Sequence, residues 1–281
     1  MSVLAVAEKD FRDAIRSRLM IVVAVMFVAF TGGGVALGSV LPGPLSGDTA
    51  LAIVTALLLQ GTSVFIPLIA LGIAFRSIAG ERESGSLKVL LSLPNSRLDV
   101  VIGKFLGRTA VVSIAVVVGF LSLLIASAIA FSGDLDVLGL VGFMLAALIL
   151  GVVFVSIAVS LSAFTDSTFG AAVGAGGLFV LFQFAWGGLV YLLRYLVNGL
   201  EAPDLGAERP EWARVLLNVN PMEGWRTSAD WLITKLAENS EVSQESADAF
   251  YLEPWFGFVV LALWIVLPLV VGYLRFESAD L

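Results

Sequence analysis

Six long stretches without a charged residue constrain the fold of this chain more than any other feature. They lie between Arg18 and Asp48, Asp48 and Arg76, Arg108 and Asp134, Asp136 and Asp166, Asp166 and Arg194, and Glu253 and Arg275. Each stretch can supply the roughly 20 apolar residues that cross a bilayer core as a helix. Strands of membrane barrels alternate apolar and polar residues, and these stretches do not. The sequence therefore predicts an all-α polytopic membrane protein with six transmembrane helices, near 19–41, 51–75, 106–131, 138–163, 169–193 and 255–274.

The overall composition supports a single membrane domain over residues 1–281. Hydrophobic residues make up 59% of the chain, whereas soluble domains are nearer 45–50% apolar. The first apolar stretch is too long, and is followed by too many others, to be a removable signal peptide.

Basic residues near the helix ends predict the orientation in the membrane, because cytoplasmic loops carry an excess of Lys and Arg. With a cytoplasmic N-terminus, 11 of the 16 basic residues lie inside and five lie in one long outer loop, residues 194–254. We therefore expect a multi-pass protein of the cell membrane with both termini in the cytoplasm.

The chain contains neither cysteine nor histidine. This composition removes thiol chemistry, imidazole general bases and the commonest ligands of soft metals. The sequence therefore predicts no catalytic residue and no metal site, and a membrane enzyme is the least favoured class. The net charge is −7, and Arg outnumbers Lys twelve to four, which is a halophile-like composition.

Two segments outside the spans have amphipathic patterns. Residues 1–18 predict an interfacial helix with Val3 and Phe11 on its apolar face and Arg12 opposite. This helix is either a membrane anchor or a contact for a cytoplasmic partner. The outer loop 194–254 carries three of the six tryptophans and Trp255 follows it directly, which predicts short amphipathic helices at the outer headgroup level.

A charged cytoplasmic loop, residues 76–99, separates the second and third spans. Its sequence from Glu81 predicts a short helix with a narrow polar stripe and a wide apolar face, ended by Pro94. Ser96 then caps the next helix, with Asp99 as its capping-box partner. An ordinary interfacial loop is the alternative, but the segment is long for a helix connection, which usually takes about 2–8 residues.

The loop resembles the first cytoplasmic loop of type 2 ABC-transporter permeases. The similarity lies in Glu81-Arg82-Glu83-Ser84-Gly85-Ser86-Leu87-Lys88, in Leu90-Leu91-Ser92-Leu93-Pro94 and in Gly103-Lys104. The stretch Asn220-Pro221-Met222-Glu223-Gly224-Trp225-Arg226 is similar to an N-P-x-x-x-x-R stretch of the family. Ser86 stands where the family commonly has Thr. The chain also resembles the branch of permeases linked to copper-site maturation of nitrous oxide reductase.

The resemblance implies that segment 80–94 is a coupling helix that docks on a separate ATPase subunit. The residues that it assigns to docking are Glu81, Arg82, Glu83, Ser84, Gly85, Leu87, Lys88, Leu90 and Leu91. A second cytoplasmic contact is implied at Thr165 and Asp166, and a second permease copy or a relative completes the transporter. The sequence has no G-x-x-x-x-G-K-[ST] phosphate loop, so ATP and Mg²⁺ are expected on the partner subunit.

Polar side chains inside the spans are few, and the deepest are Gln60 and Gln183. Hydrogen bonding between helices is the expected role of such residues, and contact with a transported substrate is the alternative. Gly170, Gly174, Gly176 and Gly177 give the fifth span a small-residue face, which packs either within one subunit or between two subunits.

Two functions are carried forward. The first is the permease subunit of an ATP-driven exporter, and the second is a non-transporting scaffold or mechanical lever that acts on an extracytoplasmic partner. An acidic outer loop, with 11 acidic residues against five basic ones between Arg194 and Pro254, motivates the second.

Overall fold

The computed structural model describes residues 3–40, 48–93, 95–130, 136–204, 206, 208–236 and 249–279, and these contain helices but no strand. The elements are α1 (Val3–Ile15), α2 (Arg18–Val40), α3 (Asp48–Ala74), α4 (Ala79–Glu83), α5 (Ser86–Ser92), α6 (Arg97–Ala130), α7 (Val137–Phe164), α8 (Thr168–Val180), the π-helix η1 (Leu181–Ala185), α9 (Trp186–Val197), α10 (Glu211–Asn218), α11 (Pro221–Leu236), the 3₁₀-helix η2 (Phe250–Leu252) and α12 (Pro254–Glu277).

Five helical segments in the described part of the chain are long and apolar enough to cross a membrane. They are Ala56–Glu83, which covers most of α3 and continues through α4, then α6, α7, the continuous helix α8–η1–α9, and α12. The bent pair α1–α2 supplies a sixth candidate. The two helices of that pair meet at 69°, next to Ser17, whose hydroxyl accepts a hydrogen bond from the Met20 amide at 3.1 Å. The predicted all-α, multi-pass architecture is confirmed.

Helix α7 forms the centre of the bundle. In an apolar 18-residue window of α7, 61% is buried, more than in the matching window of any other candidate span of the described residues, and α7 packs against α3, α6, α11 and α12. Ser156 Oγ donates to the Ile265 carbonyl of α12 at 2.5 Å, and Ser160 Oγ donates to the Pro268 carbonyl. At Gly272 the two helices approach so closely that a Cβ atom would lie 2.6 Å from Ser160 Oγ.

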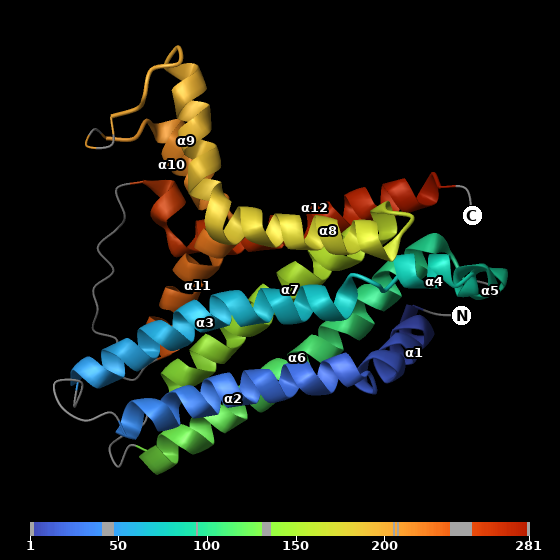
Figure 1. The fold of residues 1–281 in the computed structure, drawn as a ribbon, viewed down its shortest axis with the longest axis horizontal. Coiled ribbons are helices and arrows are strands. Elements are labelled where there is room, and N and C mark those ends of the chain that lie inside the picture. The colour runs from blue at the N-terminus through green and yellow to red at the C-terminus, as the bar shows by residue number, and fades with distance from the viewer. Residues whose placement is uncertain are drawn as a thin grey trace.

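The fifth span bends at the π-helix η1. Figure 1 shows α8 running along the bundle and α9 turning away from it at this point. A π-turn inserts an extra residue into the helical ladder, which is a known cause of a kink. The sequence predicted the span at 169–193 but not this bend.

The outer loop departs from the predicted surface helices. Helix α11 packs on α7 and α12, where Trp225 is 1% exposed and its Nε1 donates to the Ala146 carbonyl at 2.9 Å. The prediction that this tryptophan lies at the membrane surface was therefore wrong, because its indole is buried inside the bundle and donates to a carbonyl there. Trp212 and Trp255 are exposed. The acidic stretch 238–248 lies outside the described residues.

Candidate functional site

The charged loop, residues 76–99, folds as two short helices, α4 and α5, rather than as one. Gly85 separates them with φ +73°, a left-handed conformation that glycine adopts without the steric cost of a Cβ atom. The amides of Ile78 and Ala79, where α4 begins, both donate to Ser162 Oγ of α7 at 2.9 Å. The expected single helix from Glu81 was wrong because of this turn, and the predicted stop at Pro94 lies outside the described residues.

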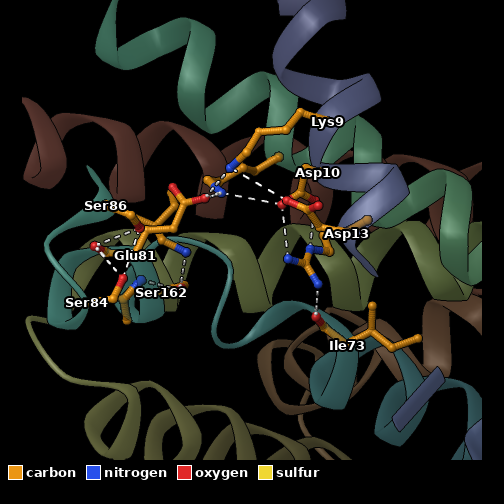
Figure 2. A network of polar contacts seen from close by, with 12 residues as sticks. Lys9, Asp10, Asp13, Ile73, Glu81, Ser84, Ser86 and Ser162 are labelled. Carbon is orange, nitrogen blue, oxygen red and sulfur yellow. Dashed lines mark hydrogen bonds and ion pairs between the residues drawn. The ribbon is translucent and has the colours of Figure 1, made fainter. Parts of the chain in front are cut away.

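Glu81 points inward, into a network of ion pairs (Figure 2). Its Oε1 atom lies 2.9 Å from Lys104 Nζ of α6 and 3.1 Å from Lys9 Nζ of α1. Burial raises the pKa of the Glu81 carboxyl, but attraction from Lys104 and Lys9 outweighs it, so the pKa lies below its ordinary value. Glu81 is therefore charged at neutral pH and joins three helices.

Asp10 of α1 extends the same network to α6 and to the end of α3. Its carboxylate lies 3.4 Å from Lys104 Nζ and accepts a hydrogen bond from Arg108 Nη2 at 3.0 Å, and its Oδ2 forms an ion pair with Arg108 Nε at 2.7 Å. Arg108 in turn donates to the Ile73 carbonyl at 2.8 Å. Lys104 and Asp10 are only 1% and 3% exposed. Because buried charges are costly without a partner, each residue of this network depends on the others.

The next two residues of α4 reach the turn between α7 and α8. Arg82 donates to the Thr165 carbonyl at 3.1 Å and forms an ion pair with Asp166. Glu83 accepts from the Thr168 amide at 2.7 Å and from its hydroxyl at 2.8 Å. The structure thus places Thr165 and Asp166 directly beside the loop, and this pairing with Arg82 was not predicted from the sequence.

The start of α6 is tied to the C-terminal end of α12. Arg97 donates to the carbonyls of Glu277 at 2.6 Å and Ala279 at 2.9 Å, and also to that of Phe276. An arginine satisfies the free carbonyls at the end of a helix in this way. The predicted capping box is present beside it, since Ser96 N donates to Asp99 Oδ2 at 2.8 Å and Asp99 N donates to Ser96 Oγ at 3.0 Å.

Helix α5 supplies the part of the loop that remains available to a partner. Leu87 and Leu90 are buried against the bundle, whereas Val89 is 67% and Leu93 40% exposed. Other exposed positions of the loop are Glu83, Ser84, Gly85, Ser86, Lys88 and Ser92, and Leu91 is half-buried. The nine residues assigned to docking therefore divide into an inward set, which includes Glu81 and Arg82, and an outward set around Lys88.

The two glutamines of the spans lie elsewhere. Gln183 of η1 donates through Nε2 to Ser63 Oγ of α3 at 3.3 Å, so it makes a hydrogen bond between helices. The Gln60 side chain is exposed on α3, and the main-chain carbonyl of Gln60 accepts from Ser63 Oγ at 2.7 Å. Among the described residues, no cluster of three or more Asp, Glu, His or Cys side chains is placed to hold a metal ion.

Comparison with known proteins agrees with this architecture. The family model of the ABC-2 family transporter protein matches residues 4–281, so the chain belongs to this family. Two relatives are each a "Probable ABC transporter permease protein NosY". That of Stutzerimonas stutzeri is 31% identical over 224 residues, which are 79% of this chain and 78% of the relative. That of Pseudomonas aeruginosa is 30% identical over 274 residues, 93% of each chain.

These findings define a multi-pass membrane permease subunit of an ABC transporter. The family implies association with an ATPase subunit, and the outward face of α5 is the candidate site for that association.

Proposed function

We propose that this chain is the permease subunit of an ATP-driven exporter and that a separate ATPase subunit docks on segment 80–94. The observation that carries the proposal is the exposed apolar side of α5, where Val89 and Leu93 project from a helix that Leu87 and Leu90 fasten to the bundle. Apolar side chains on one face of a short helix fit a groove in a partner protein. ATP and Mg²⁺ then bind to the partner, because this sequence has no phosphate loop.

The inward contacts of the loop would carry movement from the docked ATPase into the membrane. Glu81 holds α1 and α6, Arg82 holds the turn between α7 and α8, and Arg97 holds the end of α12. A displacement of α5 would therefore move the cytoplasmic ends of these helices together. Residues Glu81 and Arg82 transmit movement in this proposal, while Lys88 and Val89 touch the ATPase.

The turn between α7 and α8 supports a second contact with the ATPase. The side chain of Asp166 is 82% exposed although it pairs with Arg82. In Figure 1 this turn, α1, α4, α5 and the C-terminal end of α12 gather at one end of the bundle. That grouping supports an orientation in the cell membrane with both termini on the cytoplasmic side.

A second copy of the chain is proposed to cover the bare face of the fifth span. Only 17% of an apolar 18-residue window in the span Thr168–Val197 is buried. Gly176 and Gly177 face open space, whereas Gly174 packs on Leu161 of the same chain. Small residues allow close approach of two helices in a membrane, so the two open glycines favour a partner helix.

Exposed apolar side chains at the end of α9 favour the alternative function, a scaffold or lever that acts on an extracytoplasmic partner. Leu196 and Val197 of α9 and Leu200 beyond it are 54%, 70% and 61% exposed, and α9 turns away from the bundle (Figure 1). ATP-dependent movement of a solute in proteoliposomes that hold this chain and its ATPase would exclude this alternative.

The proposal is tested by co-purifying the permease with its ATPase. We expect Val89→Asp to weaken the complex by more than tenfold, because a charge placed in an apolar groove loses its hydration. Val89→Ile should retain the complex, and both variants should stay monodisperse because the side chain is exposed. Undiminished ATPase recovery with Val89→Asp would contradict docking at α5.

A further inference from the structure

A cavity of about 380 Å³ lies where the fifth span bends, away from the cytoplasmic loop. Residues of η1 and α9 line one side, among them Gln183, Phe184 and Trp186, and residues around α10 and α11 line the other, among them Arg209 and Glu223. The volume falls within the range of small-molecule sites, roughly 300–1,000 Å³. π-Turns inside helices frequently mark functional sites.

The wall formed by η1 is held in place by a buried amide. Asn220 is 3% exposed, donates through Nδ2 to the Phe182 carbonyl of η1 at 2.8 Å and accepts from the Met222 amide at 2.9 Å. Trp186 Nε1 likewise donates to the Leu216 carbonyl of α10 at 3.0 Å. These groups have protein partners, so they shape the cavity rather than offer bonds to a ligand.

Three other polar groups of the cavity retain unused bonding capacity. Gln183 Oε1 is buried and accepts no hydrogen bond, which is a costly state for an amide oxygen. Glu223 pairs through Oε1 with Arg226 at 2.9 Å, which leaves Oε2 as an acceptor. Arg209 is exposed at the rim and, within the described part of the chain, forms no ion pair. Gln183 Oε1 has no accessible surface as it stands, so the amide must turn toward the cavity to present this acceptor, which would also satisfy its missing hydrogen bond. Glu223 Oε2 is the second acceptor, and Arg209 is a separate cation.

We propose that this cavity binds a zwitterionic ligand that carries a primary ammonium group beside an acidic group. The ammonium would donate to the Glu223 carboxylate and, once the Gln183 amide turns toward the cavity, to Gln183 Oε1, and the acidic group would pair with the Arg209 guanidinium. The ring of Phe184 would cover the methylene groups between the two charges. The phosphoethanolamine headgroup of a lipid and free phosphoethanolamine share this chemistry.

The proposal is tested by native mass spectrometry of the full-length protein in detergent. Phosphatidylethanolamine and phosphatidylcholine with the same acyl chains are added at equal concentrations, and their dissociation constants are compared. We expect about tenfold tighter binding of phosphatidylethanolamine, since the trimethylated ammonium of choline cannot donate a hydrogen bond to Gln183. Equal dissociation constants for the two lipids would overturn the proposal.

Variants of the cavity separate this site from other lipid contacts. Arg209→Ala and Gln183→Leu should each remove most of the preference, whereas Arg214→Ala, an equal change of charge on exposed α10 outside the cavity, should keep it. If Arg209→Ala keeps the full preference for phosphatidylethanolamine over phosphatidylcholine, the proposal is also overturned. This variant should fold normally, because the Arg209 side chain is exposed. Displacement of the lipid by free phosphoethanolamine would assign the site to a free solute, and its failure would assign it to a lipid headgroup.

Discussion

The cytoplasmic loop and the fifth span are held in the molecule in opposite ways. Glu81, Arg82 and Glu83 bind α1, α6 and the turn between α7 and α8 through charged contacts. In an apolar 18-residue window of the fifth span only 17% is buried, and a Cβ atom at Gly176 or Gly177 would have no neighbour within 4 Å. The loop is thus complete within one chain on its inward side, whereas the span needs lipid or another chain to cover it.

This difference suggests where rigidity and movement lie. A loop connected to several helix ends by buried ion pairs can shift only together with them. A span with few contacts in its own subunit, and with a π-turn along its length, can change its packing at lower cost. We infer that movement enters at the loop and that the fifth span is the element most free to respond.

The largest effect is expected from removing the central cation of the loop network. Lys104→Met leaves the Asp10 and Glu81 carboxylates without their shared partner, which should lower the free energy of unfolding by about 3–5 kcal/mol. Thermal unfolding in detergent measures the loss. Lys235→Met, at an exposed lysine of α11, is the matched control and should leave the unfolding temperature unchanged. A stable Lys104→Met protein would show that the network does not hold the loop.

Two glycines of the fifth span, Gly174 and Gly177, test whether its exposed face is an interface between two copies of the chain. Gly174→Leu places a side chain against Leu161, where Cβ alone would be 3.3 Å from Cδ2, and should destabilise the subunit by about 1–3 kcal/mol. At Gly177 a Cβ atom would have no neighbour within 4 Å, so Gly177→Leu should leave stability intact and weaken association of two copies. Light scattering and thermal unfolding separate the two outcomes. Unchanged self-association of Gly177→Leu would contradict a subunit interface on this face.

The smallest effect is expected where the loop meets α12. Arg97→Gln loses the charged donor to the carbonyls of Glu277 and Ala279, and should lower stability by about 1 kcal/mol because water can replace part of the bond at this half-buried position. The C-terminal turn of α12 should exchange its amide protons faster, which hydrogen exchange with mass spectrometry detects. If Arg97→Gln lowers the free energy of unfolding as much as Lys104→Met does, the Arg97 contact with α12 is as strongly buried as the Lys104 ion pairs, which would contradict this account.

Local features of this fold were accessible from the sequence, because each depends on neighbouring residues. The apolar stretches predicted the spans, and the Ser96–Asp99 spacing predicted a capping box that the structure contains. Gly85 was visible as well, yet its left-handed turn was not inferred, because glycine also occurs in helices that continue.

The long-range contacts of the loop could not be predicted in the same way. The pairs Lys104–Asp10 and Arg82–Asp166 join residues 94 and 84 positions apart, so they exist only once the helices are arranged. An amphipathic pattern in α11 likewise fits a membrane surface and a bundle interior equally well. The buried position of Trp225 follows from its contact with α7, which no local pattern specifies.

The central claim is that α5 is the surface that meets the ATPase, and the absence of cysteine from this chain allows a direct test. A single Val89→Cys variant carries a photoactivatable cross-linker, is mixed with the ATPase subunit and is irradiated. Leu252→Cys, an exposed position of η2 at the outer loop, is the control. The account predicts a permease–ATPase adduct from position 89 and none from position 252. No adduct from position 89, or equal adducts from both positions, would contradict it.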